Sequence, residues 1–101
     1  MSFDHEAFWS ARYRDAGDDY LFGTAPNKFL ASQAAHFGEG VSVLSVADGE
    51  GRNAVWLAEQ GCTVTATEIS AVALEKAARL ARARHVAVDF VRADIFNWDW
   101  P

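Results

Sequence analysis

The sequence has a single cysteine, Cys62, and few positive charges: nine Lys and Arg stand against fourteen Asp and Glu. One cysteine excludes an internal disulfide framework and fits a reducing, cytoplasmic compartment. The formal net charge of -5 gives no general electrostatic reason to bind nucleic acid or an anionic membrane surface. The three histidines are scattered and none shares helical spacing with a second ligand, which argues against a zinc site.

Long apolar runs are also missing. The apolar stretches have the length of strands, far short of the ~20 residues that span a bilayer. The chain does not start with a basic segment, an apolar run and a cleavage site, which argues against a secretory signal. A length of 101 residues, half of them hydrophobic, is enough for one small globular domain. Four tryptophans and seven phenylalanines crowd toward the two ends, more ring surface than so small a unit can bury alone.

The first 40 residues predict two helices. Residues 4–16 have apolar and charged positions at helical spacing. Residues 17–25 form a loop rich in turn formers. A second helix is expected over residues 26–37, opened by Pro26, with Phe29, Leu30, Ala34 and Phe37 on one side.

From residue 41 onward, predicted strands and helices alternate. Residues 41–46 are apolar on both alternating sets, as in a parallel strand covered on both faces. The elements expected after this strand are a helix over 52–60, a strand over 63–67, a helix over 71–83 and a strand over 86–91. Ser70 is placed to cap the last helix, whose expected packing face is Val72, Leu74, Ala77, Ala78 and Ala81. The β-α-β-α-β order predicts an α/β fold with a parallel sheet.

Small residues follow the first predicted strand at alternate positions: Ala47, Gly49 and Gly51. They leave room for a ligand against the backbone, and the next helix starts there with free N–H groups. Ligands collect at this end of the strands in open α/β sheets. A dinucleotide-binding motif would have a third glycine where Arg52 stands, which counts against NAD and FAD.

The run from Val43 to Ala58 resembles the first motif of class I S-adenosylmethionine-dependent methyltransferases, in which an acid precedes spaced glycines. The stretch that starts Glu-Gly-Arg-Asn is similar to the subgroup with tellurite-resistance and thiopurine methyltransferases, and the similarity covers most of the chain. Ser45 stands where the family has an acid, and an alanine replaces the first glycine. Asp48 or a water is expected to take over the lost contact. The resemblance implies a Rossmann-like, doubly wound parallel sheet and S-adenosylmethionine as the cofactor.

Two carboxylates at the following strand ends complete the predicted site. Glu68 follows Gly49 at close to the ~20 residues expected for a carboxylate that accepts hydrogen bonds from ribose hydroxyls. Ile69 would then be an apolar wall for the adenine ring. The resemblance implies that Asp94 receives the adenine amine and that the backbone N–H of Ile95 meets a ring nitrogen. A solvated loop acid for Glu68 and a turn-capping role for Asp94 are the alternatives.

The resemblance also implies that the segment before the second helix folds over the methionine end of the cofactor. Phe22 would form an apolar lid and Asn27 would supply an amide, while helix capping and core packing stay equally open. We therefore expect a helical cap and lid in residues 1–40 and the first half of a cofactor-binding domain in residues 41–101. The sheet is expected to be truncated after its third strand, which leaves one edge of the first strand unpaired.

The implied reaction moves a methyl group from a sulfonium to a nucleophile by in-line displacement, with the enzyme mainly positioning the reactants. The acidic charge and the subgroup favour a small-molecule acceptor. Its contacts and any general base would lie beyond Pro101, so the natural protein is expected to be longer and the 101-residue chain alone inactive. The alternatives are a non-catalytic nucleotide-binding or assembly module, whose sheet edge a second copy or another subunit covers, and an NAD-linked oxidoreductase.

Overall fold

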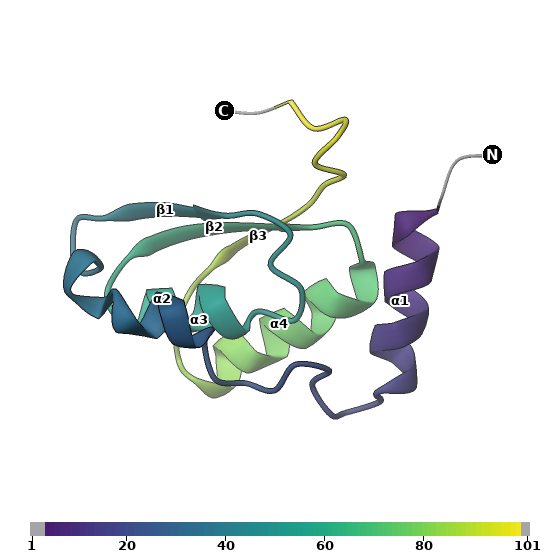
Figure 1. Cartoon of the computed structure of the whole chain (residues 1–101), viewed down its shortest axis with the longest axis horizontal. Coiled ribbons are helices and arrows are strands. Elements are labelled where there is room, and N and C mark those ends of the chain that lie inside the picture. The colour runs from purple at the N-terminus through teal and green to yellow at the C-terminus, as the bar shows by residue number, and fades with distance from the viewer. Residues whose placement is uncertain (1–3, 100–101) are drawn as a thin grey trace.

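The computed structural model describes residues 4–99. Its helices and strands are α1 (His5–Asp15), α2 (Lys28–Ser32), the 3-10 turn η1 (Ala34–His36), β1 (Ser42–Ser45), α3 (Arg52–Glu59), β2 (Thr63–Glu68), α4 (Ala71–Ala83) and β3 (Asp89–Arg92). The predicted alternation of strands and helices after residue 41 is confirmed (Figure 1). Within residues 4–99, no helix is long and apolar enough to cross a membrane.

The three strands form one parallel sheet in the order β1-β2-β3. Val43 pairs with Val64 across the first two strands, and Ala66 pairs with Phe90 across the last two. Because the strands are parallel, their carboxyl ends lie at the same edge of the sheet. Helix α1 stands beside that edge (Figure 1), and the side chains of Ser10 and Ser70 join it there to the start of α4.

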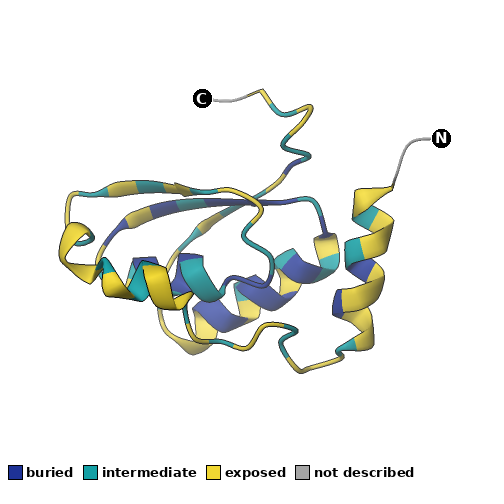
Figure 2. Ribbon diagram, in the orientation of Figure 1, coloured by how far each residue is buried: buried dark blue, intermediate teal, exposed yellow. Residues whose placement is uncertain are grey.

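Helices α3 and α4 lie against one face of the sheet (Figure 1). The main core cluster joins α3 to β2, and Val43 of β1 packs against it; its buried members are Ala54, Leu57, Cys62, Val64 and Ala66. Figure 2 shows the buried residues concentrated between these helices and the sheet. Alanine at 54 and 66, both fully buried, lets α3 approach the strands closely.

The opposite face of the sheet is only partly covered. Leu44 on β1 is 38% exposed, and Trp98 lines a shallow hollow over this face. The expectation that residues 41–46 are covered on both faces is therefore wrong for the described chain. Among residues 4–99, β1 pairs only with β2, so its outer edge lacks a strand partner, as expected.

Two element boundaries differ from the prediction. The helix expected over 26–37 is the short α2 followed by η1, because the side chain of Asn27 caps the backbone N–H groups of the first turn. Pro26 therefore lies before the helix; Phe29 is 74% exposed, whereas Leu30 and Phe37 pack against the main core cluster. The third strand begins at Asp89, not at residue 86, because its pairing with β2 begins at Asp89, opposite Thr65.

Helix α4 has the predicted bounds, and Ser70 caps it by accepting a hydrogen bond from the backbone N–H of Ala73. Its buried face is shifted from the expected one: the buried residues are Ala73, Lys76, Ala77, Leu80 and Ala81. The prediction selected apolar side chains, and it therefore missed the one charged residue that this face buries.

Candidate functional site

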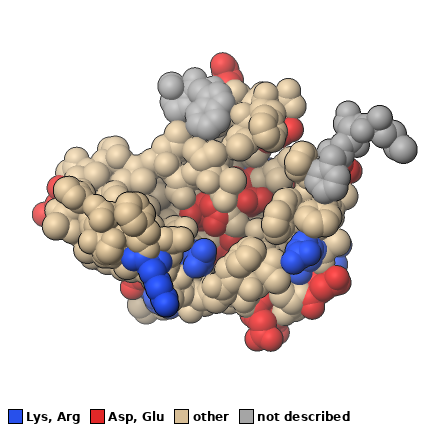
Figure 3. Space-filling view, in the orientation of Figure 1, with Lys and Arg blue, Asp and Glu red and all other residues tan. Residues whose placement is uncertain are grey.

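A crevice of two adjoining hollows lies at the carboxyl edge of the sheet. The larger, of about 270 Å³, is called the apolar hollow and is lined by His5, Trp9, Tyr13, Phe22, Ala47, Glu68, Ile69, Ala93, Asp94, Ile95 and Phe96. The smaller, of about 160 Å³, is called the polar hollow and is lined by Tyr13, Phe22, Gly23, Ala47, Asp48, Gly49, Glu50, Arg52 and Asn53. Figure 3 shows carboxylate groups gathered in a depression near the centre of one face of the molecule.

The structure brings most of the predicted site residues to this crevice. Those that line the apolar hollow are Phe22, Ala47, Glu68, Ile69, Asp94 and Ile95. Asp48 and Gly49 line the polar hollow. Gly51 and Asn27 line neither hollow, and each has a different role in the fold.

The turn after β1 needs small residues at two positions. Ala47 and Gly49 have φ of +53° and +70°, in the left-handed region that favours glycine. A Cβ atom at position 49 would lie 3.1 Å from the hydroxyl oxygen of Tyr13. The turn therefore keeps its backbone open toward the polar hollow, because a side chain at position 49 would meet the ring that closes the crevice.

Gly51 serves the packing of the two helices. It has φ of +92° at the N-cap of α3, and a Cβ atom there would lie 2.8 Å from the Cβ atom of Ala77 on α4. Its missing side chain lets the helices approach each other. Gly51 thus serves helix packing and lines neither hollow, and its predicted role in ligand binding stays a prediction.

Asn27 has the capping role that was left open. Its side-chain oxygen accepts hydrogen bonds from the backbone N–H groups of Phe29 and Leu30 at the start of α2. Its own backbone N–H donates to the side-chain oxygen of Asn53, 2.8 Å away. Asn53, rather than Asn27, lines the polar hollow.

Glu68 is buried, at 5% exposure, which excludes the alternative of a solvated loop acid. One carboxylate oxygen accepts a hydrogen bond from the backbone N–H of Gly49 at 3.0 Å, and the other accepts from Ser70 at 2.9 Å. The side chain thus ties together the loops that follow β1 and β2. Each oxygen has a second lone pair, so the carboxylate can still accept hydrogen bonds from a ligand in the apolar hollow.

Asp94 caps the turn after β3 while it lines the apolar hollow. Its two oxygens accept hydrogen bonds from the backbone N–H of Phe96 at 3.0 Å and the side-chain amide of Asn97 at 3.1 Å. Ile69 and Ile95 line the same hollow. This combination of aliphatic walls and a fixed carboxylate suits a flat heterocycle that carries an amino group.

Asp48 contains a carboxylate oxygen with no partner. Its Oδ1 accepts hydrogen bonds from the Ser45 hydroxyl at 2.6 Å and the Ala54 backbone N–H at 3.2 Å. Its Oδ2 is buried and has no hydrogen-bond partner among residues 4–99. Burial raises the pKa of Asp48 above its ordinary value, against the lowering effect of those two hydrogen bonds. A buried acceptor left open beside the polar hollow suits a cationic donor.

Tyr13 and Trp9 are crevice residues that the sequence analysis did not select. The rings stack with centroids 5.9 Å apart, and Tyr13, only 4% exposed, lines both hollows. Burial, followed by the negative charges of Glu68, Glu50 and Asp48, raises the pKa of Tyr13, so its hydroxyl stays protonated at neutral pH. The two rings share a helix face at i, i+4 spacing, but no local signal places that face against the glycine turn.

The sequence matches one family model, described as a methyltransferase domain, over residues 43–101. None of the curated proteins matches it significantly. A solved structure from work on the conversion of a disulfide bond into a thioacetal group during echinomycin biosynthesis has 26% identity, covers 90% of this chain and 40% of its own, and has a TM-score of 0.76.

Two further solved structures share the fold. One is a SAM-dependent methyltransferase from Thiobacillus denitrificans in complex with S-adenosyl-L-homocysteine, at 24% identity and a TM-score of 0.65, with 93% of this chain and 38% of that one covered. The other is a TehB-like SAM-dependent methyltransferase from Corynebacterium glutamicum, at 20% identity and a TM-score of 0.60. The match covers 90% of this chain and 46% of that one. The chain thus spans less than half the length of these three structures.

Proposed function

This chain belongs to the methyltransferase domain family, and from that membership we propose that its crevice binds S-adenosylmethionine for methyl transfer to a small-molecule acceptor. The observation that carries the proposal is the buried, unpartnered Oδ2 of Asp48 beside the polar hollow, next to an apolar hollow that contains two fixed carboxylates. Together the two hollows offer one site for a charged amino-acid end and one for a nucleoside.

The polar hollow fits the methionine part of the cofactor. Asp48 lines this hollow, and its unpartnered Oδ2, which is buried in the structure, would accept a hydrogen bond from the ammonium group once the turn shifts to admit the ligand. Arg52 lines the same hollow at the start of α3, where a guanidinium and free backbone N–H groups favour a carboxylate. Asp48 would thus replace the acid that the family has at the position of Ser45, and the Ser45 hydroxyl holds it in place.

The apolar hollow fits the adenosine part. Glu68 would accept the ribose hydroxyls, and Asp94 would accept the exocyclic amine of adenine. Ile69 and Ile95 would lie against the ring, and the backbone N–H of Ile95 would meet a ring nitrogen, as the resemblance implies. The resemblance implies these roles, and their support is that all four residues line the same hollow.

The bound cofactor would supply a methyl group activated by a sulfonium. The chain's own part is to bind, orient and exclude water. Tyr13 and Phe22 line both hollows, so they shield the region where the hollows meet. The protonated hydroxyl of Tyr13 adds no negative charge there and stays a hydrogen-bond donor.

The subgroup and the acceptor are further parts of the proposal. We propose that the chain belongs to the subgroup with the tellurite-resistance and thiopurine methyltransferases. The stretch Glu50–Asn53 supports this, and a TehB-like enzyme shares the fold. The net charge of -5 favours a small molecule over nucleic acid as the acceptor.

Isothermal titration calorimetry of the full chain with S-adenosylhomocysteine tests the proposal, with NAD as the competing ligand. We expect binding of S-adenosylhomocysteine but not of NAD. Glu68→Gln should weaken binding roughly tenfold or more, since a hydrogen bond to a charged group contributes about 1.5–3 kcal/mol. Glu75→Gln, at an exposed position on α4, is the matched control and should bind like the wild type. Binding of NAD alone, or equal affinity of the two variants, would contradict the proposal or its ribose assignment.

A further inference from the structure

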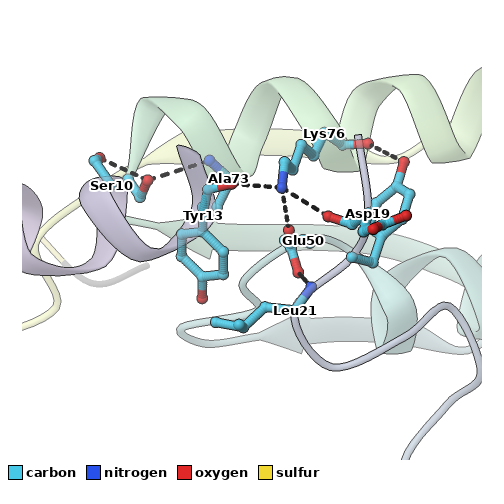
Figure 4. A network of polar contacts seen from close by, with 9 residues as sticks. Ser10, Tyr13, Asp19, Leu21, Glu50, Ala73 and Lys76 are labelled. Atoms are coloured by element: carbon cyan, nitrogen blue, oxygen red, sulfur yellow. Dashed lines mark hydrogen bonds and ion pairs between the residues drawn. The ribbon is translucent and has the colours of Figure 1, made fainter. Parts of the chain in front are cut away.

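A buried ion pair joins α4 to the glycine turn beside the crevice. The ammonium nitrogen of Lys76 lies 2.9 Å from a carboxylate oxygen of Glu50, and both side chains are only 3% exposed (Figure 4). Removing two charges from water costs enough that such a pair gives little net stability compared with apolar side chains of similar size. Its other hydrogen bonds, all to the backbone of the N-terminal segment, indicate a role in holding that segment.

The pair binds three backbone groups of the N-terminal segment. Lys76 also donates to the carbonyl oxygens of Tyr13 at 2.6 Å and Asp19 at 2.9 Å, which uses all three of its N–H groups. The other oxygen of Glu50 accepts the backbone N–H of Leu21 at 2.6 Å. Figure 4 shows these contacts converging from the N-terminal segment on the pair.

These anchor points coincide with the residues that close the crevice. Tyr13 is itself held by Lys76, and Leu21 directly precedes Phe22; the rings of Tyr13 and Phe22 line both hollows. Glu50 directly follows Gly49 and lines the polar hollow. The ion pair therefore links the glycine turn below the crevice to both aromatic rings at its wall.

We propose that Lys76 and Glu50 are positioning residues that latch the N-terminal segment over the cofactor crevice. The pair acts through Tyr13 and Phe22, and cofactor affinity depends on it although Lys76 lines neither hollow. This inference rests on the proposed function, because it assigns the closed wall of the crevice to S-adenosylmethionine binding.

The test removes both charges together, because a single substitution would leave one buried charge uncompensated. In the double variant Lys76→Met with Glu50→Gln, the glutamine keeps an acceptor for the backbone N–H of Leu21. The carbonyl oxygens of Tyr13 and Asp19 lose the ammonium group that donates to them. The matched control is Arg84→Met with Glu59→Gln, which removes a more exposed ion pair between α4 and α3 with an N–O distance of 3.2 Å.

The readouts are calorimetry with S-adenosylhomocysteine and hydrogen–deuterium exchange followed by mass spectrometry, both on the full chain. We expect the dissociation constant of the double variant to rise at least tenfold. We also expect exchange to become faster in residues 13–22 but to stay unchanged in β2, a pattern that separates local release of the segment from global destabilisation, while the loss of affinity separates positioning from a merely structural role. The control should match the wild type in both measurements.

A dissociation constant within twofold of the wild type, or faster exchange spread evenly over the sheet, would overturn the latch. Tyr20→Phe gives an independent variant if the double variant does not fold. It removes only the hydroxyl that donates to the carbonyl oxygen of Lys76 at 3.0 Å, so it should weaken binding at least twofold. Unchanged binding in that variant likewise overturns the latch. A wild-type chain that does not bind S-adenosylhomocysteine would instead refute the proposed function.

Discussion

Replacement of Asp48 by Asn changes one atom of the buried turn. The Oδ1 atom can keep its hydrogen bonds from Ser45 and Ala54, while an amide group replaces the buried Oδ2, which has no partner in the described part of the chain. Burial already raises the pKa of Asp48, because the fold disfavours its charged form. The variant should therefore be more stable than the wild type in the absence of ligand.

The size and the pH dependence of this gain follow from the buried charge. The substitution removes the desolvation cost of the buried charge, whereas the new amide N–H groups have no acceptor and cost about 1–3 kcal/mol, so we expect the net rise in the free energy of unfolding of Asp48→Asn at pH 7.5 to be at most about 1 kcal/mol. Since the folded pKa lies above the ordinary value of 3.8, the folded state binds the proton more tightly than the unfolded state does. Wild-type stability therefore falls as the pH rises through the interval above 3.8, and the advantage of the variant disappears as the pH drops below it.

Ligand affinity should move in the opposite direction to stability. The variant loses a charge-assisted hydrogen bond to the ammonium of the cofactor, which contributes about 1.5–3 kcal/mol, or roughly 10- to 100-fold in affinity. Urea unfolding at pH 7.5 and pH 4 and calorimetry with S-adenosylhomocysteine measure the two effects. Asp89→Asn, at an exposed position on β3, is the control. A variant that is less stable at pH 7.5 and binds the ligand as tightly as the wild type would refute the reasoning.

Three more predictions concern the glycine turn and the tyrosines. Gly51→Ala should lower the free energy of unfolding by about 2–4 kcal/mol in urea, because a positive φ and a clash with α4 act together. Gly40→Ala is the comparison, because Gly40 has a φ of +83° but a Cβ atom there would meet nothing within 4 Å. It should lower the free energy of unfolding by only about 1–2 kcal/mol. Ala47→Gly should raise the free energy of unfolding by about 0.5–1 kcal/mol, measured by thermal unfolding, because glycine adopts a φ of +53° without strain. Burial raises the pKa of Tyr13 and Tyr20, so absorbance titration should find both ionising above 10, with stability falling as the pH rises past 10.

The sequence was sufficient to predict the fold after residue 41, because local signals there agree with one another. Ser70 marks the start of α4 by capping it, and the alternation of short apolar runs with helical patterns predicts the parallel sheet. The prediction failed where a capping side chain outweighed the apolar pattern, as at Asn27. It also failed at Leu44, where sequence periodicity does not show whether another layer covers the strand.

The site could be predicted only in part. Glu68 and Asp94 could be selected because each ends a strand, and the parallel sheet brings strand ends together. The contacts of Lys76 could not be predicted, since its partners at Tyr13 and Asp19 lie 63 and 57 residues away in the chain. Such pairings depend on how α1 docks, and no short pattern encodes that geometry.

The sequence separation of the Lys76 contacts also sets an order of folding events. Loop closure over so many residues is entropically costly, so these contacts should form after the β-α-β-α-β unit has assembled. The crevice is then completed by the last segment to dock. A ligand that binds only the completed crevice should stabilise the chain by RT ln(1 + L/Kd), where L is the free ligand concentration, so the melting temperature should keep rising with the logarithm of that concentration.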